Sequence, residues 1–293
     1  MTGSLRTGLG RVPAPILFLL GGCSMYLGAS LAVGLFAQLS PAVVAWLRMV
    51  GAALVLLVWR RPGRPAWRGR RVCVAGGFGL VTAVMNIAFY QAIGLLPLGT
   101  AVAVEFCGPV LVAALGSRGS RDWAALVLAA AGVLLIAESG TGGATARWGT
   151  APMGLIWALG AAAAWAGYIV LARRVAVAGN GLDDMAVGFT VAAVLLAPLA
   201  AGTGPVWRDP RLLVLGIGVG VLSSVLPYVL DQVVLRRVGP ARFAVLLALL
   251  PVTASAVGFV VLEQLPRPLE MAAIGAVVAA VALRTRDGDA PTV

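Results

Sequence analysis

The sequence predicts an all-α integral membrane protein with ten transmembrane helices. Of its 293 residues, 60% are hydrophobic and 11% are charged, and the mean hydropathy is +0.98. A soluble domain carries about 25% charged residues. The net charge of +11 comes from arginines in short loops between apolar runs. That distribution is the topology signal of a membrane protein and differs from a basic nucleic-acid groove.

Ten apolar runs have about the length of 20 residues that a helix needs to cross the hydrocarbon core. The first is too long for the apolar part of a signal peptide and lacks a small-x-small cleavage site, so we expect it to be retained. Connections are too short to hold a soluble domain. The predicted spans are 13–35, 40–59, 72–94, 98–116, 122–138, 152–172, 185–202, 211–235, 241–262 and 268–284.

The arginines predict the orientation. If the N-terminus is cytoplasmic, 17 of the 22 arginines fall in cytoplasmic segments, four fall on the other side, and Arg48 lies within a span. Cytoplasmic loops of membrane proteins carry this excess of positive charge. Both termini are therefore predicted to be cytoplasmic.

Two local similarities at nearly the same offset indicate a duplication. GGCSMYLG at 21–28 is similar to GAAAAWAG at 160–167, at an offset of 139 residues, and 96–99 and 109–110 have loose counterparts at 238–241 and 251–252, at an offset of 142. Five spans is an odd number, so the second half enters the membrane from the opposite face, an arrangement typical of transporters. We predict inverted five-helix repeats at 1–139 and 150–284, with a short cytoplasmic tail at 285–293.

The composition argues against an enzyme. There is no histidine, and Cys23, Cys73 and Cys107 lie in apolar runs without the spacing of a zinc site or a disulfide framework. Phosphate-binding glycine motifs are absent, which leaves an ion gradient or the substrate gradient as the energy source. We predict no cofactor, no metal and no nucleic-acid partner. A membrane-embedded enzyme acting on lipid would need clustered acid–base groups or metal ligands, and the scattered carboxylates disfavour it.

Glu105 is the main candidate for a functional residue. It lies inside the apolar span 98–116, and Pro109 follows four residues later. Proline has no N–H, so the carbonyl of Glu105 loses its helical partner and a kink is expected. A charge at mid-membrane costs at least about 2.5–3.5 kcal/mol, which makes it a functional-site hypothesis. The alternative is a glutamate that is protonated or paired for structure only.

Other polar side chains lie deep in the spans. Arg48 lies about 12 Å below Ser40 at 1.5 Å per residue, and it is either a substrate ligand or a structural anchor on a carboxylate or a freed carbonyl. Asn86 and Tyr90 share one helix face, as do Ser224, Tyr228 and Asp231. Asp231 is either a functional group of this face or one half of an ion pair with Arg236 or Arg237 at the cytoplasmic end of the span. Further helix breaks are predicted at Pro227, which frees the carbonyl of Ser223, and at Pro251.

Aromatic residues divide into two groups. An interfacial belt suits Trp46, Trp59, Trp123 and Trp148. Trp165 and Tyr168 lie further into their span, and Tyr26 and Ser24 are polar groups of the first span. We therefore place Trp165, Tyr168 and Ser24 among the candidate substrate-binding residues.

The run 88–110, which contains Pro-Leu-Gly-x-Ala-Val-Ala-x-Glu-Phe-x-Gly-Pro, resembles the drug/metabolite transporter superfamily. More narrowly, it is similar to EamA-type inner-membrane exporters of threonine and homoserine. Further matching pieces lie at 40–48, 222–228 and 259–263, and the resemblance covers essentially the whole chain. It implies ten spans in two EamA repeats and proton-coupled export of small neutral amino acids or their analogues. For the oligomeric state we expect a monomer or a homodimer.

A zwitterionic amino acid needs a partner for each charged end, and this requirement gives the candidate residues their expected roles. Arg48 would bind the substrate carboxylate, and Glu105 would bind its ammonium group and the coupling proton, since burial favours the neutral form of a carboxyl group. Asp231 is a second candidate for proton coupling, and Asn86, Tyr90, Trp165 and Tyr228 would line the cavity. The chain has Leu250 where such exporters often carry a glutamate before Pro251. That difference keeps an EamA-type exporter of drugs or other metabolites as the alternative.

Overall fold

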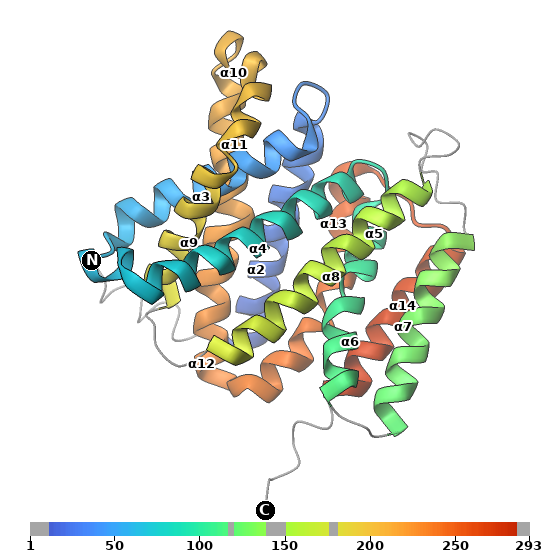
Figure 1. Ribbon diagram of the computed structural model, residues 1–293. Coiled ribbons are helices and arrows are strands. Elements are labelled where there is room, and N and C mark those ends of the chain that lie inside the picture. The colour runs from blue at the N-terminus through green and yellow to red at the C-terminus, as the bar shows by residue number, and fades with distance from the viewer. Residues whose placement is uncertain (1–11, 117–119, 139–150, 176–180, 286–293) are drawn as a thin grey trace, which may run out of the picture.

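The computed structural model describes residues 12–116, 120–138, 151–175 and 181–285, and every regular element within these ranges is a helix. Figure 1 shows the helices packed side by side in one bundle. They are α2 (Ala14–Leu35), α3 (Pro41–Arg60), η1 (Arg64–Trp67), α4 (Gly69–Ile93), α5 (Leu98–Glu105), α6 (Cys107–Gly116), α7 (Ser120–Glu138), α8 (Ala151–Val175), α9 (Gly181–Leu195), η2 (Ala197–Thr203), α10 (Gly204–Arg208), α11 (Arg211–Gly220), η3 (Val221–Val225), α12 (Leu226–Leu247), α13 (Leu250–Leu262) and α14 (Pro268–Thr285).

Among the described residues, five helices are long and apolar enough to cross a membrane individually, or six if one bent pair counts as a single span. The bent pair joins 181–195 to 197–208 at an angle of 65°. Four shorter apolar helices cover 98–112, 123–136, 250–262 and 268–283. The chain is therefore an all-helical, multi-pass membrane protein.

The chain leaves regular α-helix close to each of the three prolines. Near Pro109, α5 ends at Glu105 and α6 begins at Cys107. Before Pro227, the residues Val221–Val225 form a π-helical turn. Pro251 occupies the first turn of α13, where its missing N–H has no cost. A further break within α12 lies at Gly239, whose φ of 77° favours glycine.

Helix ends follow local sequence signals. Ser40 caps α3, and its hydroxyl accepts a hydrogen bond from the N–H of Val43 at 3.4 Å, with Pro41 in the first turn. The first N–H of α5, that of Leu98, donates to the side-chain oxygen of Gln264 at 2.8 Å. This hydrogen bond connects the start of α5 to the segment that follows α13.

Every residue of α5 is buried, and this helix packs against α13, α8 and α14. Elsewhere in the bundle, α4 packs on α8 and α9, α2 packs on α12 and α13, and α7 pairs with α14. Glycine permits the closest approaches, as in polytopic membrane proteins generally. A side chain at Gly79 of α4 would collide with the backbone of Gly188 in α9, and one at Gly220 would meet the backbone carbonyl of Arg48.

Candidate functional site

Arg48 is the centre of a buried polar cluster. Its side chain lies between α3, α4 and the π-helical turn, and the residue is 8% exposed. Nε donates to the hydroxyl of Ser224 at 2.9 Å, and Nη2 donates to the carbonyl of Ser223 at 2.9 Å. Nη1 lies 3.5 Å from the hydroxyl of Tyr90, and the guanidinium carbon lies 5.5 Å from the centre of that ring. Three of the five guanidinium N–H groups thus have partners.

The acceptor on Ser223 exists because of Pro227. In a regular helix the N–H of residue 227 would bond to the carbonyl of Ser223, but proline has no N–H. The chain widens into a π-turn here, and the N–H of Leu226 bonds to the carbonyl of Val221 instead. The free Ser223 carbonyl then receives Arg48. Arg48 thus binds a carbonyl freed by proline, which is one of the structural roles that the sequence allows for it.

Glu105 lies at the end of α5 and is 8% exposed. No hydrogen bond or ion pair to its carboxylate is present among the described residues, although Arg48 is close enough for the two charges to interact. The neighbouring Phe106 packs edge-on against Trp165, with ring centroids 4.8 Å apart. A carboxylate and a guanidinium thus share one region without forming a salt bridge.

Asp231 lies on α12 and faces α2. One carboxylate oxygen lies 3.7 Å from the position that a side chain at Gly21 would occupy. Within the described residues Asp231 forms no ion pair, so the predicted alternative with Arg236 or Arg237 does not occur there. Arg237 donates to the carbonyl of Val12 at 2.9 Å.

The other predicted residues fall in two places. Tyr90 joins Arg48, and Asn86 is buried one turn away, with an amide nitrogen that has no partner among the described residues. Ser24 donates to the carbonyl of Leu222 at 2.8 Å. Tyr168 instead packs edge-on against Phe78, and it lies within electrostatic range of Tyr228, which is also near Asp184. Tyr168 and Tyr228 therefore lie toward the start of α9.

Sequence reasoning omitted three members of this region from the predicted site. Ser223 and Ser224 bind Arg48, and the signal for them was Pro227, four residues after Ser223. Tyr26 is buried on α2 within electrostatic range of both Glu105 and Asp231. The sequence placed Tyr26 within the first span, but its proximity to carboxylates on two other helices depends on the packing.

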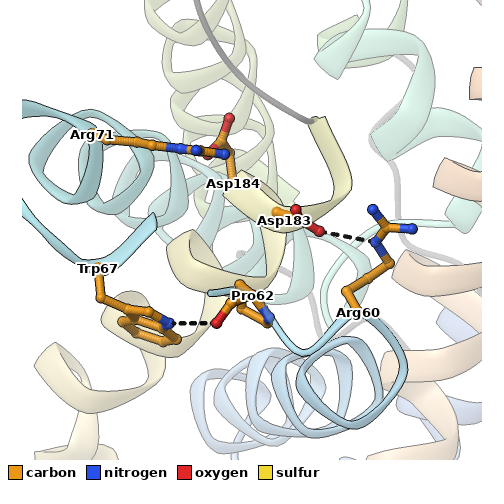
Figure 2. Close-up of polar contacts among 6 residues, drawn as sticks. All are labelled: Arg60, Pro62, Trp67, Arg71, Asp183 and Asp184. Carbon is orange, nitrogen blue, oxygen red and sulfur yellow. Dashed lines mark hydrogen bonds and ion pairs between the residues drawn. The ribbon is translucent and has the colours of Figure 1, made fainter. Parts of the chain in front are cut away.

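A second group of arginines lies at the start of α9. Arg60 pairs with Asp183 at 2.9 Å, and Arg71 pairs with Asp184 at 2.7 Å. Figure 2 shows both arginines directed at adjacent carboxylates, with the indole of Trp67 donating to the carbonyl of Pro62 nearby. These pairs join α3 and α4 to α9. No group of three or more potential metal-ligating residues occurs in the part of the chain that the structure describes.

Among the predicted belt residues, Trp59 and Trp123 are exposed, whereas the indole of Trp46 donates to the carbonyl of Ala193 at 2.9 Å. Trp148 lies outside the described residues.

Comparison with known proteins identifies the family. The profile of the EamA-like transporter family matches residues 152–286. The chain is 34% identical over 281 residues to the threonine/homoserine exporter RhtA of Escherichia coli strain K12, covering 96% of this chain and 93% of the relative. RhtA of Salmonella typhimurium strain SL1344 is 34% identical with the same coverage.

A crystal structure with 21% sequence identity has a TM-score of 0.57 and matches 93% of this chain and 99% of its own, which supports the fold. Taken with the identity to the two exporters along almost the whole chain, these matches show that the protein belongs to the EamA-like transporter family.

Proposed function

We propose that this protein is a secondary active exporter of small neutral amino acids such as threonine and homoserine, driven by protons. The observation that carries the proposal is the buried pair of Arg48 and Glu105. The two charges share one region, yet no salt bridge joins them, and Arg48 is held by neutral partners. Burying charges without direct neutralisation is costly, so a ligand that neutralises both is the natural occupant.

A zwitterionic amino acid has the required chemistry. Two N–H groups of Arg48 remain beyond the three with partners, and a guanidinium binds a carboxylate through two parallel hydrogen bonds. Glu105 can accept the ammonium group, or a proton when the substrate is absent. Asn86 offers a buried amide nitrogen that has no partner among the described residues, suited to the hydroxyl of threonine or homoserine. Asp231 is the proposed second proton site, because no described arginine pairs with it.

The proposed architecture is ten spans in two inverted repeats, 1–139 and 150–284, in the inner membrane with both termini and the 285–293 tail in the cytoplasm. Contacts between loops support it, because each joins segments predicted on the same side. Arg60 with Asp183 and Arg237 with Val12 join cytoplasmic segments. Leu98 with Gln264 joins two segments predicted on the outer side.

Transport into proteoliposomes tests this function. Purified protein should accumulate labelled threonine or homoserine when a pH gradient is imposed, and a protonophore should abolish accumulation. Glu105→Gln should reduce gradient-driven transport by about tenfold or more. The substitution removes one contact to a charged group, and such a contact supplies about 1.4 kcal/mol or more, which corresponds to a factor of about ten. Glu263→Gln is the matched control, because Glu263 is exposed at the end of α13. Wild-type transport by Glu105→Gln would contradict the proposed role.

A specific observation favours a second cargo class. Leu250 lies at the start of α13, buried, where its side chain packs close to Gly22 of α2. This position offers hydrocarbon where amino-acid exporters of this type often have a carboxylate, which suits a less polar metabolite or drug. A growth panel with amino-acid analogues and toxic amphiphiles separates the two. Resistance to amphiphiles alone would favour the second class.

A further inference from the structure

A groove of about 730 Å³ runs along the outside of the bundle between α2, α11 and the end of α13. Its α2 wall includes Leu27 and Leu31, and its α11 wall includes Leu215, with Leu222 beyond it. On α2 the lining side chains follow one another at intervals of three and four residues, so they form a single helix face. Ser30 also lies on this wall, but its hydroxyl is itself covered. The groove therefore presents hydrocarbon along its length.

The groove has the length of one membrane leaflet. From Leu27 to the helix end at Leu35 the α2 wall advances about 12 Å at 1.5 Å per residue, and Gln38 extends it into the following turn. On the opposite wall, α11 covers about 14 Å from Arg211 to Gly220. Half of a hydrocarbon core of about 30 Å is about 15 Å. One end of the groove is thus near mid-membrane, and the other is at the surface.

The surface end carries charge of both signs. Gln38, Asp209 and Arg211 lie there, and no described residue pairs with the guanidinium of Arg211. Asp209 accepts the backbone N–H of Arg211 at 3.0 Å, which fixes the two residues beside each other. Trp207 is 84% exposed two residues before Asp209, as expected for an indole at the membrane–water interface.

We propose that this groove binds a phospholipid whose headgroup carries both a phosphate and a primary ammonium, as in phosphatidylethanolamine. One acyl chain lies along the leucines, the phosphate contacts Arg211, and the ammonium contacts Asp209. A free amino acid matches the two charges but leaves the apolar groove unfilled. A purely anionic headgroup matches Arg211 but is repelled by Asp209. The site lies between the two halves of the chain, apart from Arg48 and Glu105.

Native mass spectrometry of the full-length protein in detergent tests the proposal. The probes are phosphatidylethanolamine, phosphatidylcholine and phosphatidylglycerol with identical acyl chains. We expect phosphatidylethanolamine to bind most tightly. Arg211→Gln should weaken it about fivefold, the order that one arginine near a membrane surface contributes. Arg208→Gln is the matched control, because Arg208 is exposed close by and does not line the groove.

Filling the groove provides a second variant. A Cβ added at Gly34, which lines the groove, or at Gly218, which does not, would have no atom of a neighbouring element within 4 Å. Gly34→Leu should therefore weaken all three lipids, whereas Gly218→Leu should weaken none. Equal effects of the two variants would overturn the acyl site. Tighter binding of phosphatidylglycerol would overturn the headgroup assignment, and displacement of lipid by threonine would show an amino-acid site instead. A failure of amino-acid transport would leave this proposal untouched.

Discussion

Arginine binds in two different ways in this molecule. Arg48 is buried and held by a backbone carbonyl, a serine hydroxyl and a tyrosine. Arg60 and Arg71 have side chains that are 35% and 33% exposed, and each pairs with an aspartate of α9 (Figure 2). Arg60 and Arg71, which solvent reaches, are paired with carboxylates and join helices, whereas the buried Arg48 has no carboxylate partner among the described residues. In our proposal the ligand binds at Arg48, whereas the ion pairs of Arg60 and Arg71 only join helices.

The interactions of the buried arginine are also expected to contribute more free energy than the ion pairs that solvent reaches. An exposed ion pair contributes about 0.2–1 kcal/mol, and salt screens it. A hydrogen bond to a charged group in the interior contributes about 1.5–3 kcal/mol, and its loss leaves a buried group without a partner. Substitutions that separate the two settings should therefore differ in both stability and transport.

The largest effect is expected for Arg48→Ala. It removes the guanidinium that holds the buried cluster together, so we expect transport to be abolished. The free energy of unfolding in detergent should fall by about 1.5–3 kcal/mol, the contribution of one hydrogen bond to a charged group. Arg48→Lys keeps the charge but lacks the planar fork, so it should restore stability more than transport. Full transport by Arg48→Lys would show that only the charge matters there.

The next effect is expected for Pro227→Ala. It restores an N–H that competes with Arg48 for the carbonyl of Ser223. Transport should fall while the unfolding temperature does not, because a helical hydrogen bond is gained. Pro251→Ala is the matched control, since Pro251 lies in the first turn of α13, where the N–H is not needed. Similar transport by both proline variants would contradict the link between Pro227 and Arg48.

The smallest effect is expected for the ion pairs of α9. Asp183→Asn should lower stability by no more than about 1 kcal/mol, and the difference from wild type should shrink at high salt. A double-mutant cycle with Arg60→Gln measures the pair directly. A coupling energy well above that range, or one insensitive to salt, would show that this pair resembles the buried setting.

The sequence was most informative about single helices. Apolar run length predicted helices such as α2 and α3 closely, since a membrane span needs a long apolar stretch. Proline positions predicted where regular helix is lost, because the missing N–H acts locally. The sequence could not predict the π-turn, nor that Arg48 would meet Ser223 and Ser224, because those contacts join residues about 175 positions apart.

The sequence also could not predict which residues meet between different helices. Spacing along one helix placed Tyr228 with Asp231, and the two do lie within electrostatic range, but the proximity of Tyr228 to Tyr168 and to Asp184 at the start of α9 comes from the packing. Likewise, Asp231 lies near Arg236 in sequence, yet its carboxylate faces Gly21 on α2. Helical spacing gives the face of a residue, and only the neighbouring helices decide what that face meets.

The most direct measurement of the central claim is a thermal-shift comparison of threonine with two analogues that each lack one charge. Threonine methyl ester has no carboxylate for Arg48, and N-acetylthreonine has no ammonium group for Glu105. A ligand raises apparent stability by mass action when it binds the folded protein. We expect threonine to stabilise the wild-type protein and neither analogue to do so. Equal stabilisation by all three would contradict a site built on both charges.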